Sequence, residues 1–129
     1  MRVGYGLLSV EHGTGSGFCQ TMHHSGWKRI GRFYIDPAGE EFGHKLIREG
    51  IKNKLPVIII DEVGPLEMQN RGWAEDLQLL ADQEDIVQVW AVRNSLVKKV
   101  SRKWPFNNYE IISTGSMTAE QLTDKILSR

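Results

Sequence analysis

Two adjacent carboxylates directly follow an apolar run in the middle of the chain. The run is Val57–Ile60, and Asp61 and Glu62 come immediately after it. A short β-branched run without alternation is typical of a strand buried on both faces, and open α/β sheets bind ligands at the carboxyl ends of such strands. One acid of such a pair can help to hold Mg²⁺, and the other can orient and deprotonate a water that attacks a phosphate. We therefore predict that Asp61 helps to hold Mg²⁺ and that Glu62 is the catalytic base.

Two further charged residues can complete this site. Glu67 follows the turn-forming pair Gly64-Pro65 and can return a third carboxylate to the same rim. Arg93 follows the predicted strand Ile86–Val92 and can contact a phosphate or sense its state. Simpler alternatives remain open, because the acidic pair can merely end a strand and start a solvated loop. In the same way, Arg93 can form an ion pair with a nearby acid.

The elements that must position these residues alternate between helix and strand from residue 37 onward. Asp36 is a good N-cap for a helix that starts at Pro37, and Thr118 with Gln121 forms a capping box for the last helix. Four helices are predicted, over residues 37–54, 72–83, 95–104 and 118–127. Three strands are predicted between them, over residues 57–60, 86–92 and 109–113. This alternation predicts an α/β fold with a mostly parallel sheet flanked by helices.

The first third of the chain is rich in glycine, with eight of the 13 glycines before residue 40. We predict a strand at 2–10 and a flexible loop at 12–17, because glycine clusters favour turns. Two β-type runs, 18–23 and 27–35, are predicted to form a hairpin around Ser25-Gly26. The N-terminal region is therefore expected to add a β-hairpin to the α/β core.

The acidic segment Asp61–Glu67, with the buried strand before it, resembles the signature of the small nucleoside-triphosphatase family of P-loop proteins. Its members are RecA-like α/β proteins that hydrolyse ATP, GTP and other nucleoside triphosphates with Mg²⁺. The resemblance covers about residues 2–115 and extends to three further segments, which are Gly4–Ser9, Arg29–Phe33 and Gln88–Val97. It implies that Asp61 lies on the magnesium side, that Glu62 activates water and that Glu67 is a supporting acid.

The phosphate-binding loop of that family does not occur in the 129 residues. A P-loop has the form G-x-x-x-x-G-K-[S/T], and this sequence has no Gly-Lys pair and no Lys followed by Ser or Thr. The glycine-rich segment Gly13–Gly17 lacks a lysine, and a mobile turn is a better interpretation than an anion-binding nest. We therefore expect residues 1–129 to form a single truncated domain that starts after the P-loop strand and helix. Such a domain is expected to be weak or inactive in hydrolysis by itself.

The expected truncation also predicts how the chain associates. In RecA-like sheets the P-loop strand lies between the strands that correspond here to 86–92 and 109–113. Without it, two apolar edges face a gap, and such edges recruit partners. We expect closure of the gap, a strand supplied by a partner, or a homo-oligomer such as a strand-exchanged dimer. A rival hypothesis from another class is a non-catalytic module that binds a protein through these edges or through the hairpin.

Composition narrows the remaining possibilities. The 16 basic and 16 acidic residues give zero net charge, so we expect no binding of DNA or RNA, and the basic residues of 98–103 are interpreted as a solvated helix face. The longest apolar run has four residues, which predicts no membrane span. The single cysteine, Cys19, favours a reducing cytoplasm. A zinc site formed by Cys19 with His12, His23 and His24 is disfavoured because the spacing matches no standard zinc pattern.

Overall fold

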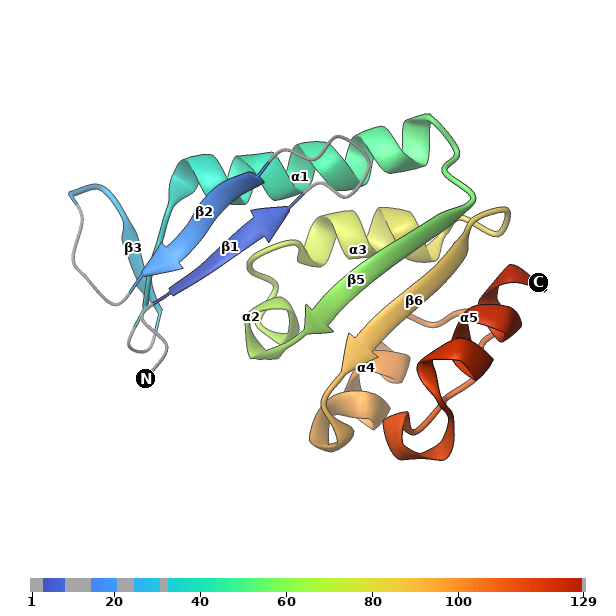
Figure 1. The fold of residues 1–129 in the computed structure, drawn as a ribbon. Coiled ribbons are helices and arrows are strands. Elements are labelled where there is room, and N and C mark those ends of the chain that lie inside the picture. Colours follow the sequence, from blue (N-terminus) through green and yellow to red (C-terminus); the bar gives the residue numbers. More distant parts are fainter. Residues whose placement is uncertain (1–3, 9–14, 21–24, 31–32, 129) are drawn as a thin grey trace.

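The protein has an α/β fold with two separate sheets, as Figure 1 shows for a computed structural model that describes residues 4–8, 15–20, 25–30 and 33–128. The first sheet is antiparallel with the strand order β1-β2-β4-β3, formed by β1 (Gly4–Leu8), β2 (Gly15–Gln20), β3 (Lys28–Ile30) and β4 (Phe33–Ile35). The second sheet is parallel and pairs β5 (Val57–Val63) with β6 (Val87–Val92). The predicted α/β class, with a parallel sheet, flanking helices and an N-terminal hairpin, is therefore confirmed.

The helices begin and end close to the predicted residues. They are α1 (Pro37–Lys52), α2 (Pro65–Met68), α3 (Ala74–Ala81), α4 (Val97–Lys103) and α5 (Ala119–Leu127), with 3-10 turns η1 (Asn94–Leu96) and η2 (Thr114–Ser116). The Asp36 side chain accepts a hydrogen bond from the Ala38 N–H (3.0 Å), as expected of an N-cap. Both bonds of the predicted capping box between Thr118 and Gln121 form, at 2.9 and 3.1 Å.

In the part of the chain that the structure describes, no helix is both long and apolar enough to cross a membrane.

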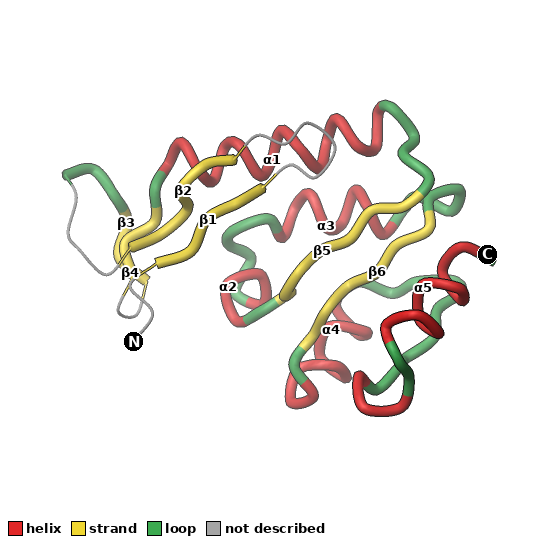
Figure 2. Tube along the Cα trace, in the orientation of Figure 1, coloured by secondary structure: helices red, strands yellow, loops and turns green. Residues whose placement is uncertain are grey.

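The main core lies between the parallel sheet and the helices α3 and α4. Figure 2 shows these helices beside β5 and β6, and the long helix α1 running from the N-terminal sheet toward β5. The buried cluster consists of Val63, Ala74, Leu77, Val100 and Trp104. Trp90 of β6 adds edge-to-face contacts with the Trp104 ring (5.8 Å between centroids) and the Phe106 ring (4.8 Å). These contacts pack Val63 of β5 and Trp90 of β6 against the residues of α3, α4 and the segment after α4.

Two details of the N-terminal region differ from the prediction. The run 27–35 forms two antiparallel strands, β3 and β4, and it pairs with β2 through β4. Gly15–Gly17 belongs to strand β2 and not to a loop, because β1 supplies a pairing partner. Residues 12–14, also predicted as loop, lie outside the described residues.

The predicted third strand of the parallel sheet, Tyr109–Ser113, is not a strand. The segment pairs with no described strand, and Tyr109 and Ile111 are 52% and 62% exposed. A β-prone sequence becomes a strand only when a neighbouring strand accepts its hydrogen bonds. None of the described strands does so here.

Two adjacent leucines of α3 provide a matched test of the core. Leu80 is fully buried, whereas Leu79 is 46% exposed. We expect Leu80→Ala to lower the free energy of unfolding by about 2–5 kcal/mol, because it removes buried methyl groups and leaves a cavity. Leu79→Ala should change it by about 0.5 kcal/mol. Urea denaturation measures both, and equal losses would contradict the packing of α3.

Candidate functional site

The acidic pair lies in a bulge at the carboxyl end of β5. Ile60 pairs with Trp90 and Val63 pairs with Val92, so β5 has one more residue than β6 in this interval. Glu62 has a φ of +68°, the left-handed conformation that residues with a side chain rarely adopt. Both acids are exposed, whereas Val63 directly after them is fully buried. Bulges and unusual backbone angles are enriched at functional sites, where they aim side chains at a ligand.

Glu62 and Arg93 form an ion pair that joins the ends of the two parallel strands. The Nε and Nη2 atoms of Arg93 donate to Oε1 of Glu62 at 3.0 and 2.7 Å. The side chains of Arg93 and Glu62 remain 61% and 47% exposed, so the pair is open to solvent and to ligands. The structure thus brings the predicted base and the predicted phosphate contact together. The ion pair that the sequence left open as an alternative for Arg93 is the arrangement observed.

Glu67 turns back toward the strand and is buried in the following turn. Its Oε1 accepts a hydrogen bond from the Gly64 N–H at 3.0 Å, and the residue is only 5% exposed. Its Oε2 has no hydrogen-bond partner among the described residues. Burial raises the pKa of the Glu67 carboxyl above its usual value, the backbone hydrogen bond from Gly64 acts in the opposite direction, and the charge of Glu62 adds to the increase. Glu67 therefore shapes the turn from inside.

Gly72 closes the other side of this turn. Its φ is +56°, and a Cβ placed there would overlap Oε2 of Glu67 and the side chain of Leu66. A side chain at this position would strain the backbone and would displace the side chains of Glu67 and Leu66. The buried carboxylate and the glycine together set the path of the chain between α2 and α3.

The donor set fits a magnesium ion held mainly by water and phosphate. Mg²⁺ is commonly bound by one or two carboxylates while it keeps several water molecules. Asp61 presents an exposed carboxylate at the strand end. Among the residues that the structure describes, no three His, Cys, Asp or Glu side chains gather closely enough to form a complete metal site. Asp61 would therefore act as a single protein ligand, and the buried Glu67 would not coordinate the ion.

A second polar cluster, which the sequence analysis missed, links α1 to α3. Asp76 is fully buried, and its carboxylate accepts hydrogen bonds from Nδ1 of His44 and from Nε of Arg48, the latter at 2.9 Å. The indole N–H of Trp73 also donates to the backbone oxygen of Glu40 at 3.3 Å. The available signal was the spacing of Asp76, which lies three residues after Trp73 and therefore on the same helix face.

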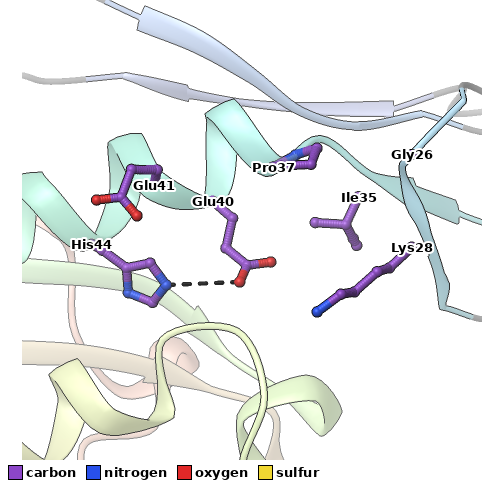
Figure 3. A pocket seen from close by; sticks show the side chains of 7 residues that line it. All are labelled: Gly26, Lys28, Ile35, Pro37, Glu40, Glu41 and His44. Atoms are coloured by element: carbon purple, nitrogen blue, oxygen red, sulfur yellow. Dashed lines mark ion pairs between the residues drawn. The ribbon is translucent and has the colours of Figure 1, made fainter.

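His44 also lines a polar hollow between the first turns of α1 and strand β3. Figure 3 shows the Glu40 carboxylate between the His44 ring and the Lys28 side chain. The Nε2 atom of His44 lies 3.7 Å from Oε1 of Glu40. An adjoining hollow of about 300 Å³ reaches Arg71 and Gly72, so it extends to the turn that holds Glu67. The hollow carries side chains of both charges, and the buried Asp76 fixes the orientation of its histidine.

The other candidate residues named from the sequence fall into two groups. His12, His23 and His24 lie outside the described residues, so the structure does not test the zinc site that the sequence disfavours. Lys98, Lys99 and Arg102 are exposed on or beside α4, in agreement with a solvated face.

Comparison with known proteins identifies the family. A family model described as NTPase matches residues 1–127. The chain belongs to this NTPase family. A search of the curated proteins found no match. The NTPase-family assignment agrees with the resemblance that rests on the acidic segment Asp61–Glu67.

A solved structure shows the same fold. The crystal structure of THEP1 from the hyperthermophile Aquifex aeolicus is similar to this chain, with a TM-score of 0.71 and 21% sequence identity. The similarity covers 98% of this chain and 76% of that chain. It supports the P-loop NTPase type of fold for this member of the NTPase family.

The buried carboxyl of Glu67 predicts a pH dependence of stability. Its pKa is 4.5 in the unfolded chain and higher in the folded chain. At a pH between the two pKa values, the folded chain therefore holds a proton that the unfolded chain has released. Stability from this group is therefore fully present below about pH 4.5 and is lost as the pH rises through the folded pKa. Glu67→Gln keeps an acceptor for the Gly64 N–H but does not ionise. We expect this variant to be more stable than the parent at pH 7, with a difference that shrinks toward pH 4.5.

Urea unfolding between pH 4.5 and 8 measures this difference. Glu75→Gln, an exposed substitution on α3, is the matched control and should behave like the parent across the range. A Glu67→Gln variant that is less stable than the parent at pH 7 would contradict the burial of an ionisable group at this position.

Proposed function

We propose that this protein binds a nucleoside triphosphate, such as ATP or GTP, with Mg²⁺ at the carboxyl ends of β5 and β6. The observation that carries the proposal is the bulge at Asp61 and Glu62, with Glu62 tied to Arg93 of the neighbouring strand. Membership of the NTPase family supports the same substrate class. Carboxyl ends of parallel strands are also where α/β proteins bind nucleotides.

Each residue has a distinct role in this proposal. Asp61 would hold the magnesium ion through its exposed carboxylate. Glu62 orients the attacking water and accepts its proton, and Arg93 contacts the phosphates. Glu67 supports the site from inside by fixing the turn at Gly64. When bound, the magnesium ion offsets the negative charge of the phosphates.

We further propose that the 129 residues by themselves hydrolyse nucleotides weakly or not at all. The P-loop lysine and hydroxyl normally stabilise the charge that develops on the transferred phosphoryl group. The 129 residues contain no motif that supplies both groups. The Glu62–Arg93 pair can contribute only part of this stabilisation, since its arginine is shared with a carboxylate.

The zero net charge and the single cysteine support two further parts of the proposal. The protein is expected to act in a reducing cytoplasm without binding DNA or RNA.

Calorimetric titration of ATP and GTP with Mg²⁺ tests the proposed nucleotide site. We expect Asp61→Ala to weaken magnesium-dependent binding by at least ~10-fold, or about 1.4 kcal/mol, because it removes the metal-side carboxylate. Glu62→Gln should retain binding and lose any residual hydrolysis. No binding by the parent chain would refute the proposal, and binding unchanged in Asp61→Ala would place the site elsewhere.

The role of Arg93 is separable from its ion pair. The pair is exposed, so Arg93→Gln should lower the free energy of unfolding by less than about 1 kcal/mol. Loss of a charged phosphate contact should weaken nucleotide binding by about 1.5–3 kcal/mol. Lys99→Gln, which removes the same charge from α4, is the control for calorimetry and urea unfolding. If the two variants bound nucleotide equally well, Arg93 would not contact the phosphates and would serve only in the ion pair with Glu62.

A second candidate function is a non-catalytic module that binds a protein partner. It is favoured by the segment Tyr109–Ser113, which is not a strand and exposes Tyr109 and Ile111. In this reading the acidic bulge is a structural feature of the NTPase fold. Nucleotide titration separates the two candidates, because only the first requires magnesium-dependent binding. Self-association is compatible with both.

A further inference from the structure

The two adjoining hollows beside α1 form one continuous space. Both are lined by Lys28, Ile35, Glu40 and His44, so we describe them together as the His44 hollow. Its larger part has a volume of about 300 Å³, at the lower end of the range for small-molecule sites. The hollow lies between α1, strand β3 and the turn that leads from α2 to α3. Its size and position suit a small ligand held by three elements of the fold.

Two cations line this hollow without an acidic partner of their own. Lys28 comes from β3, and Arg71 comes from the turn before α3. Neither side chain forms an ion pair with another described residue. Figure 3 shows the Lys28 side chain extending into the hollow from β3. Hydrogen bonds from a charged donor to an anion are stronger than those between neutral groups. Lys28 and Arg71 can therefore bind an anionic group that enters the hollow.

The wall formed by α1 carries acceptors that a buried group holds in place. Asp76 is fully buried, and its carboxylate accepts hydrogen bonds from Nε of Arg48 at 2.9 Å and from Nδ1 of His44. Because an ionised carboxylate only accepts, the His44 ring has a proton on Nδ1, and Nε2 of the neutral ring is an acceptor. This Nε2 atom lies 3.7 Å from Oε1 of Glu40. An ammonium group has three N–H donors and can bond to both atoms.

We propose that the His44 hollow binds a small zwitterion, namely a free α-amino acid. The ammonium group of the ligand donates to Glu40 and His44, and its carboxylate accepts from Lys28 and Arg71. Ile35 is only 5% exposed and gives the hollow an apolar surface for the carbon atoms of the ligand. This proposal does not depend on nucleotide binding.

The charges around the hollow select a ligand that carries both signs. The charged side chains that line it are those of Lys28, Arg71, Glu40, Glu41 and Glu75. A phosphate would bring its negative charge close to three acids, and like charges that face each other oppose binding. A simple amine would cover the two cations without pairing them, and covering an unpaired charge costs free energy. A zwitterion pairs with both sets of charges.

Amide chemical shifts of the ¹⁵N-labelled 129-residue chain test the binding. Each standard amino acid is added singly at millimolar concentration. We expect at least one of them to shift the amides of Lys28, His44 and Gly72 in a saturable way. The same carbon skeleton without its amine, or without its carboxylate, should bind at least ~10-fold more weakly. If no amino acid shifts these amides, or if either analogue binds as tightly as the amino acid, the proposal is wrong.

Substitutions in the hollow assign the two charges of the ligand. Glu40→Gln and Lys28→Gln should each weaken binding of the amino acid at least ~10-fold, because each removes one charged contact. Glu40→Gln should also reduce the preference for the amino acid over the analogue that lacks the amine. Glu49→Gln and Lys52→Gln make the same changes on α1 outside the hollow and should bind like the parent.

The spectra of these variants also show whether each one is folded, because amides far from the substitution should keep their positions. Binding that is as tight in both hollow variants as in the parent would overturn the proposal. So would an equal loss of binding in the two control variants, because the site would then not be the hollow.

Discussion

The parallel pairing of β5 with β6 is the constraint on which the candidate site depends. It brings the acidic end of one strand beside the basic end of the next, so that Glu62 and Arg93 meet at 2.7 Å. The bulge in β5 keeps Val63 in the core and turns Glu62 into a left-handed conformation. Packing thus supports an unfavourable backbone angle at the residue where the proposed chemistry needs a directed carboxylate.

Buried carboxylates hold the elements around this strand end. Glu67 accepts the Gly64 N–H, and Asp76 accepts hydrogen bonds from two side chains of α1. A buried acid costs free energy unless its hydrogen bonds are satisfied. Asp76 meets this condition through His44 and Arg48, whereas Glu67 meets it at one oxygen only. Glu67 therefore has the larger uncompensated cost of burial, and it lies in the turn next to the proposed nucleotide site.

The carboxyl-terminal part of the chain has a different balance of forces. No residue of α5 is fully buried, and the segment before it exposes Tyr109 and Ile111. Lys125 of α5 forms an ion pair with Glu110 of that segment at 3.0 Å, so a polar contact joins the helix to the segment.

Much of the fold and part of the site could be predicted from the sequence. Asp36 with Pro37, the Thr118 capping box, the β-branched run of β5 and the acids after it are local signals, and local hydrogen bonding and burial periodicity decide such features. The tertiary structure alone decided that Arg93 pairs with Glu62, that Glu67 is buried and that Asp76 holds His44. It also decided that Tyr109–Ser113 forms no strand. Each of these depends on which distant groups become neighbours, because a side chain's partner and a strand's ladder come from elsewhere in the chain.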